Sequence, residues 1–126
     1  MSENIVMKIK LTELQETILL ELSKTNNFPF ICKKLNIKSI TLTKAIQSLT
    51  DKDMLNNNTL TEKGKKMVHY LEFRNETISS FLTKYNIPNT NEIYNQLTKV
   101  DYRVIIALKN LIWFTSHFFH NKEPSS

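Results

Sequence analysis

The stretch LNIKSITLTKAIQSLTDKDMLNNNTLTEKGKK, residues 35–66, decides the fold that we predict for this chain. It reads as the end of a short helix, a turn at 36–38 and a second helix at about 39–51. A tiny hairpin and the start of a long helix follow. This order is that of a helix-turn-helix with a wing, in which the second helix enters the major groove of DNA. We therefore predict a mainly α chain in which residues 1–66 form a winged helix-turn-helix DNA-binding domain.

The apolar residues recur at the spacing that this interpretation requires. A first helix is expected at about 12–24, with Thr12 as its N-cap, and a second helix follows Pro29. In the helix at 39–51, helical spacing predicts a buried stripe made of Leu42, Ala45, Ile46 and Leu49.

The wing is predicted to be very short. Its strands would be residues 54–55 and 59–60, with Asn56–Asn58 at the tip, because asparagine tolerates the left-handed backbone of such a turn. Thr61 can then cap a long helix that runs to about Lys84. We therefore expect a hairpin with an uncharged tip.

The last helix, expected at about 101–119, is apolar nearly all round. A helix of this kind must be buried on every side, and the chain has few other elements to cover it. We predict a homodimer in which residues 67–120 form a helical dimerisation region and 121–126 a disordered tail. The alternative is that helices of the same chain bury this helix completely. The residues expected at the dimer interface are Ile105, Leu108, Ile112, Trp113 and Phe114.

A further short helix is expected between the two long ones. Asn89 and Glu92 resemble the ends of a capping box, and the helix would end at Leu97.

Positive charge is concentrated between residues 24 and 66. Nine lysines against three acidic residues give nine minus three, or +6, whereas the whole chain carries +5. Basic charge on a groove-sized element indicates a polyanionic partner, double-stranded DNA, although a lysine-rich surface can also serve solubility alone. The residues expected to contact bases or phosphates are Lys33, Lys34, Lys38, Ser39, Thr41, Thr43, Lys44, Gln47, Asn57, Lys63 and Lys65.

Several classes of function are disfavoured. A single glycine is too few for a phosphate-cradling loop, and no serine–histidine–acid or cysteine–histidine arrangement has suggestive local context, so we do not expect an enzyme. The sequence shows neither a secretion signal nor a membrane span, and its one cysteine suits a reducing compartment, so we expect a cytoplasmic protein. Cys32 is interpreted as a small buried hydrophobe, with a redox sensor as the alternative. His117 and His120, three residues apart, are a weaker candidate metal pair.

Three segments resemble the metal-dependent repressors of the diphtheria-toxin-repressor and manganese-transport-regulator type. They are LTDKDML at 49–55, LTEKGKK at 60–66 and RNETISSFL at 74–82, and the resemblance covers roughly residues 12–114. It implies a homodimeric repressor whose DNA binding is switched by Mn²⁺ or Fe²⁺.

The chain departs from this family at the metal site. Glu13, Glu16 and Asp101 stand at positions of acidic ligands, whereas the histidine of the family's arginine-histidine motif is Asn75 here. A later glutamate and a later histidine of the family align with Thr98 and Tyr102. Losing two nitrogen donors and one carboxylate weakens a first-row metal site severely. We therefore expect no resident cofactor and metal gating that is lost or altered.

Two interpretations of a winged helix compete here. The first is a transcriptional regulator and repressor; one variant is a regulator of the multiple-antibiotic-resistance type, whose wing is normally longer and basic. The second is a protein-interaction module, an anti-repressor or the partner of a regulator, which has no specific DNA binding of its own.

Overall fold

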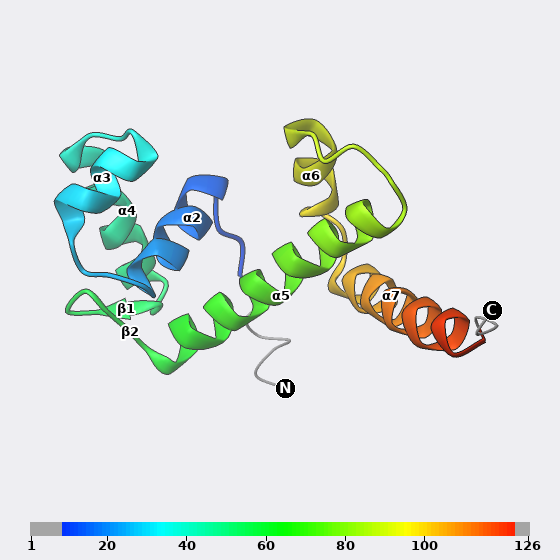
Figure 1. The fold of residues 1–126 in the computed structure, drawn as a ribbon. Helices are drawn as coiled ribbons and strands as arrows, with labels where there is room; N and C mark the ends of the chain where they lie inside the picture. Colours follow the sequence, from blue (N-terminus) through cyan, green and yellow to red (C-terminus); the bar gives the residue numbers. More distant parts are fainter. Residues whose placement is uncertain (1–8, 123–126) are drawn as a thin grey trace. The chain divides into compact units, whose positions relative to one another are not determined.

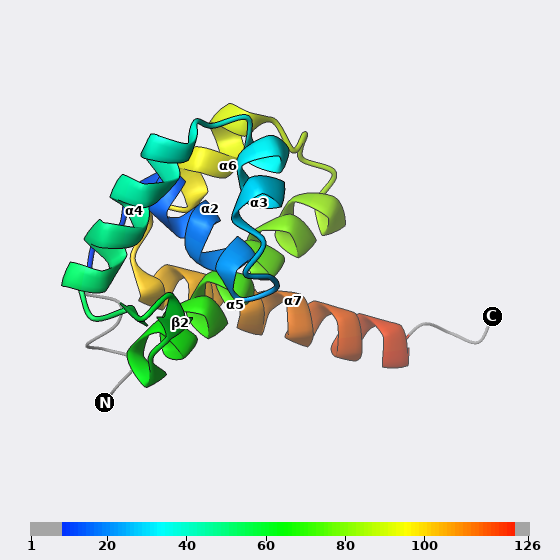
Figure 2. The same ribbon diagram turned by 90° about the vertical axis from the view of Figure 1, so that its left-hand side faces the viewer.

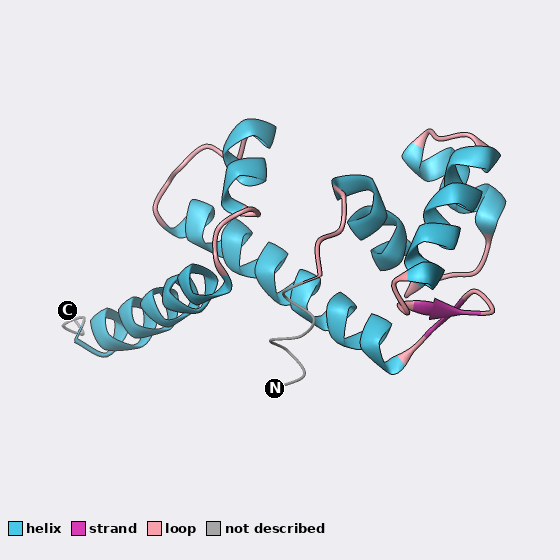
Figure 3. Cartoon of the chain, turned by 180° about the vertical axis from the view of Figure 1, so that it is seen from behind, coloured by secondary structure: helices cyan, strands magenta, loops and turns pink. Residues whose placement is uncertain are grey.

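A computed structural model describes the backbone of residues 9–122 and the side chains of residues 9–117. This part of the chain is mainly helical, with one two-stranded antiparallel sheet, so the predicted mainly α composition with a short hairpin is confirmed (Figures 1 and 3). The elements are α2 (Glu13–Leu22), α3 (Phe28–Leu35), α4 (Ser39–Asp51), β1 (Leu55–Asn56), β2 (Thr59–Leu60), α5 (Glu62–Lys84), α6 (Asn91–Leu97) and α7 (Tyr102–Lys122).

Local signals set the ends of the first helices. The Thr12 hydroxyl accepts a hydrogen bond from the backbone N–H of Gln15 at 3.1 Å, and the Gln15 side chain accepts one from the Thr12 N–H at 3.0 Å. This reciprocal capping box begins α2, as the sequence predicts for Thr12. Asn27 caps α3 in a similar way, and Asn36 ends it in the left-handed conformation.

The hairpin after α4 turns through asparagine residues. Leu55 pairs with Leu60 in the antiparallel register, and the tip residues Asn57 and Asn58 have φ angles of 53° and 63°. Positive φ at both central residues defines the two-residue turn that matches the twist of a hairpin. The left-handed asparagines predicted for the tip are confirmed at Asn57 and Asn58, whereas Asn56, also predicted in the tip, belongs to β1 and pairs with Thr59.

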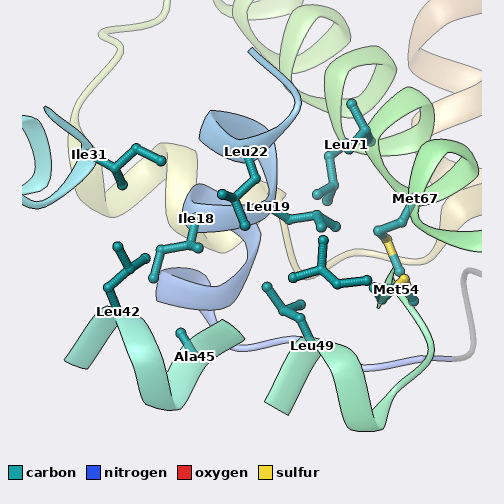
Figure 4. Packing of buried hydrophobic residues seen from close by; sticks show 12 residues of the cluster. Ile18, Leu19, Leu22, Ile31, Leu42, Ala45, Leu49, Met54, Met67 and Leu71 are labelled. Atoms are coloured by element: carbon teal, nitrogen blue, oxygen red, sulfur yellow. The ribbon is translucent and has the colours of Figure 1, made fainter. Parts of the chain in front are cut away.

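The chain divides into two compact units between Leu71 and Glu72, inside α5; the division expected at residue 66 falls near the start of the same helix. In the first unit, α4 packs beside α2 (Figure 2) and also contacts α3 and β1. The buried residues of α4, Leu42, Ala45 and Leu49, meet apolar side chains of α2 and of the start of α5 (Figure 4). The core of this unit contains Ile18, Leu19, Leu22, Ile31, Leu42, Ala45, Leu49, Met54, Leu55, Met67, Val68 and Leu71.

Gly64, the one glycine of the chain, lies where α5 meets the segment before the hairpin. A Cβ at this position would overlap the carbonyl oxygen of Met54. That oxygen already accepts a hydrogen bond from the Thr61 N–H at 3.1 Å, and the Thr61 hydroxyl accepts one from the Gly64 N–H at 3.0 Å. The absence of a side chain at Gly64 therefore allows the capped start of α5 to lie against Met54.

The second unit is built on a smaller core of Ile78, Leu82 and Ile105. The N-cap of α6 is Thr90, whose hydroxyl accepts a hydrogen bond from the Ile93 N–H at 3.2 Å. The predicted capping box of Asn89 with Glu92 is therefore wrong by one residue, because a threonine in extended conformation follows the asparagine. The helix α7 continues to Lys122, and residues 123–126 of the expected tail lie outside the described part.

None of the helices in the described residues has the length and apolar character needed to span a bilayer.

Candidate nucleic-acid interface

The outward face of α4 carries the residues predicted to read DNA. Because Leu42, Ala45 and Leu49 are buried on the inner face, helical periodicity turns Thr43, Lys44 and Gln47 toward solvent, and all three are exposed. At the N-terminal end of the same helix, Lys38, Ser39 and Ile40 are exposed and Thr41 is half-buried. Ile40 is an exposed apolar residue, with 62% of its surface accessible. One face of α4 thus presents hydroxyl, amide, ammonium and aliphatic groups together.

Two of these side chains already have hydrogen bonds within the helix. The Thr43 hydroxyl donates to the Ser39 carbonyl oxygen at 3.0 Å, which leaves its methyl group and its lone pairs to the outside. The Gln47 amide nitrogen donates to Asp51 Oδ1 at 2.9 Å. Lys44 has no salt bridge with any residue in the described part of the chain.

The N-terminus of α4 differs from those of α2, α3 and α6. Side chains cap those three helices, whereas Lys38, at the N-cap of α4, provides no side-chain hydrogen bond. The first backbone N–H groups of a helix carry a partial positive charge and have no partner inside the helix. An exposed end of this kind, next to the Lys38 ammonium, is suited to a phosphate group.

The two predicted lysines of α3, Lys33 and Lys34, have different surroundings. Lys33 is exposed at the end of α3. Lys34 is different, because its Nζ lies 2.9 Å from Glu21 Oε2, and the Glu21 side chain is only 9% exposed. A phosphate contact by Lys34 would leave this buried carboxylate without its cation. The structure therefore gives Lys34 a role in joining α3 to α2, which the sequence did not reveal.

The start of α5 and the hairpin tip carry the other residues that are predicted to contact DNA. Lys65 is exposed and forms an ion pair with Glu62 at 3.3 Å, a surface pair of small energetic weight. Lys63 is half-buried, and Asn57 is exposed at the tip. These residues belong to the same unit as α4.

The predicted metal ligands are divided between the two units of the chain. Glu13 and Glu16 lie in the first turn of α2, whereas Asp101 belongs to the second unit. Asp101 instead accepts hydrogen bonds from Arg103, with Nε at 3.0 Å from Oδ1 and the terminal nitrogen at 3.2 Å from Oδ2. The side-chain and backbone hydrogen bonds from Arg103 lower the pKa of Asp101 below its ordinary value.

Other metal candidates of the sequence have different partners. Asn75, at the position of the family's histidine, accepts hydrogen bonds from the Arg74 guanidinium at 2.9 and 3.1 Å. His117 stacks on Trp113, and its Nδ1 lies 2.9 Å from the Trp113 carbonyl oxygen. The His120 side chain lies outside the described part. Among the described residues, no three His, Cys, Asp or Glu side chains gather in a group that could hold a metal ion.

The predicted dimer residues of α7 are divided between two environments. Ile105 is fully buried in the core of its own unit, against Ile78 and Leu82, so its assignment to a dimer interface is wrong: the side chain is already covered. Leu108 and Ile112 are half-buried. Trp113 and Phe114 are 57% and 51% exposed.

The structure also places Cys32, which the sequence analysis weighed, and two features that the sequence did not single out. Val104 and Leu111 of α7 are each 43% exposed, although they are large and apolar. Cys32 is half-buried against the core of the first unit. In the second unit, Lys84 Nζ donates to Ser116 Oγ at 3.2 Å beside an open groove of about 400 Å³ that is lined by Ser79, Ser80, Thr83, Lys84, Ile112 and Ser116.

No family model, no curated protein and no solved structure matches this chain.

Proposed function

We propose that this protein is a DNA-binding transcriptional regulator, a repressor, that acts as a homodimer. Its first unit would be a winged helix-turn-helix, with α4 as the recognition helix and the β1–β2 hairpin as a short wing. One observation carries the proposal: α4 is buried on one side and offers Lys44, Gln47 and Thr43 on the other, with Lys38 at an uncapped N-terminus.

The chemistry of this face suits base edges. A lysine donates to the O6 and N7 acceptors of guanine, and a glutamine can bind N6 and N7 of adenine together. Lys44 and Gln47 are three residues apart, so they are neighbours on one face of α4. The Ile40 side chain and the Thr43 methyl group can contact the methyl group of thymine. Gln47 exchanges its hydrogen bond with Asp51 for one with a base.

Phosphate contacts provide most of the affinity in this proposal. Lys33 and Lys38 are exposed, and the uncapped amides of α4 lie beside Lys38. Each neutralised phosphate steepens the salt dependence, with a slope of roughly −0.9 in log K against log salt concentration. Binding to random duplex DNA should therefore weaken sharply as salt rises.

Regulation by Mn²⁺ or Fe²⁺ is not part of this proposal. Asp101 is paired with Arg103, and the Asn75 amide oxygen is engaged by Arg74. An amide that replaces an imidazole is a weaker ligand for a first-row metal. Metal gating of the kind found in the resembling repressors would thus be lost or altered.

The test is selection of bound sequences from a random duplex pool, followed by titration at several salt concentrations. The variant K44A/Q47A should keep the fold and lose sequence preference, by roughly 1–3 kcal/mol for each lost base contact. Q96A/K99A is the matched control, because it also removes one exposed glutamine and one exposed lysine three residues apart, but from the second unit. Equal loss in both variants would contradict the assignment of α4, and absence of salt-sensitive binding at micromolar protein would contradict DNA binding itself.

A protein-interaction module is the second candidate. The hairpin tip carries no charge, and Phe30 of α3 and Leu14 of α2 are 51% and 37% exposed. These apolar side chains belong to the same unit as α4 and would favour a protein partner over a polyanion. Failure of the DNA titration, with a folded and monodisperse protein, would favour this alternative.

A further inference from the structure

The helix α7 carries two apolar stripes. The inner stripe, Ile105, Leu108 and Ile112, is buried or half-buried in the second unit. The outer stripe consists of Val104, Ala107, Leu111 and Phe114, all of which are exposed. At 100° per residue, the centres of the two stripes lie roughly a third of a turn apart. The outer stripe is therefore a separate surface.

The spacing of the outer stripe is that of a helix–helix seam. Its residues are separated by three, four and three positions, which is the a/d pattern of a 3.5-residue repeat. No charged residue interrupts it. A stripe with this repeat keeps facing one partner helix over several turns, whereas scattered exposed apolar residues do not. The pattern points to another helix as the occupant.

Side-chain size favours a second copy of α7 in antiparallel orientation. If the two copies cross midway between Ala107 and Leu111, each Val104 meets a Phe114 and each Ala107 meets a Leu111. Each of these facing pairs forms one layer of the interface, and every layer joins a smaller side chain to a larger one, which fills space evenly. In a parallel pair, Ala107 would face Ala107 and Phe114 would face Phe114, which leaves a void in one layer and crowds another.

The charges of α7 allow two copies to approach. Arg103, which flanks the outer stripe, is held by Asp101 through contacts of its backbone N–H at 2.7 Å and its guanidinium at 3.0 and 3.2 Å. This local pair neutralises it. Lys109 lies nearly half a turn away from Leu111 around the helix. Two like stripes can therefore meet without facing cations.

We propose that the outer stripe of α7 is the seam of a two-fold, antiparallel helix pair between two copies of this chain. The inference rests on the homodimer included in the proposed function, and it specifies which residues form the interface. Of the residues predicted from the sequence it keeps Phe114, and it replaces Ile105, Leu108, Ile112 and Trp113 with Val104, Ala107 and Leu111. A two-fold pair is self-complementary, as the symmetric layers require.

The first measurement is the mass of the full chain in solution. The parent should have twice the chain mass of 14.8 kDa, and both L111E and F114E should be monomers with unchanged helical content. W113E is the matched control, because Trp113 is adjacent to Phe114 and similarly exposed, yet it points away from the outer stripe. A monomeric parent, or a dimer that W113E disrupts as strongly as F114E, would overturn the proposal.

The second measurement, disulfide trapping, tests the orientation. The variants V104C and F114C are made in a C32S background. Each variant is oxidised by itself, and a third sample in which the two variants are co-expressed is oxidised in the same way. In the antiparallel pair, two Val104 residues are separated by roughly 15 Å along the helices, which exceeds the reach of a disulfide. A covalent dimer should therefore form only in the co-expressed sample. A covalent dimer of V104C alone or of F114C alone would overturn the antiparallel seam. So would the absence of a covalent dimer in the co-expressed sample.

The DNA titration separates this inference from the proposed function. If the protein is monomeric but binds duplex DNA with salt dependence, the seam and the homodimer are wrong, whereas the assignment of DNA binding to α4 stands. If the seam is trapped but no DNA binds, the seam stands and the regulator is wrong.

Discussion

Replacing Gly64 with alanine sets helix propensity against packing at the start of α5. Propensity alone favours alanine over glycine in a helix interior by about 1 kcal/mol. The added Cβ, however, would overlap the Met54 carbonyl oxygen and lie 3.2 Å from Leu60 Cδ2. The carbonyl cannot move away freely, because it accepts the hydrogen bond from the Thr61 N–H.

The magnitude follows from these contacts. Forcing an extra group into a packed site costs about 1–3 kcal/mol. Weakening the Thr61–Met54 hydrogen bond costs about 1 kcal/mol more. After subtraction of the propensity gain, G64A should lower the free energy of unfolding by about 1–3 kcal/mol. The sign is opposite to that expected for an ordinary helix position.

Urea unfolding followed by circular dichroism measures this difference. The S80A variant is the control, because Ser80 is exposed in the same helix and its replacement should change stability by no more than about 0.5 kcal/mol. A G64A protein as stable as the parent, or more stable, would refute the reasoning. It would mean that the contact between Gly64 and Met54 can relax without cost.

Three further predictions concern ion pairs and metal. K34A should lower the free energy of unfolding by about 1–3 kcal/mol, because it leaves the buried Glu21 carboxylate unpaired. The control K33A should change the free energy of unfolding little. Equal effects of the two variants in urea unfolding would contradict this prediction. Because Arg103 lowers the pKa of Asp101 below 3.8, the stabilisation by this carboxylate is present above that pH and is lost as the pH falls through the lower folded-state value. R103Q removes the guanidinium and keeps the backbone N–H, so it should raise the pKa of Asp101 in an NMR titration, and no change would exclude the Arg103 side chain as the cause. Adding Mn²⁺ should leave the affinity for a selected duplex unchanged, and a sharp increase would show that a metal switch persists.

Much of the fold could be predicted because its signals are local. The range of α4, the caps at Thr12 and Thr61, and the asparagine turn at Asn57 and Asn58 depend on residues within a few positions of each other. Capping and turn formation act over this distance, so the sequence is sufficient. The exposed face of α4 follows from the same periodicity.

The remaining features depend on contacts between distant residues. Lys34 looked like a phosphate ligand because its partner, Glu21, lies in another helix. Ile105 looked like an interface residue because its cover, Ile78 and Leu82, comes from α5. In α7 the inner and outer stripes overlap in the sequence as one apolar run, and only the burial of one stripe separates them. Long-range packing decides such cases, and a single sequence does not specify it.

The turns of this chain have a consequence for its unfolded ensemble. In the described part, the residues with positive φ are Asn36, Asp53, Asn57, Asn58 and Asn86, and none of them is a glycine. A glycine at such a position would fit without steric cost, but it would widen the range of conformations open to the denatured chain. By using asparagine and aspartate there, the polypeptide has less backbone freedom to lose when it folds. Because no glycine stands at these positions, each turn depends on a residue that tolerates the left-handed region. A β-branched replacement at any of the five should therefore disfavour the native turn.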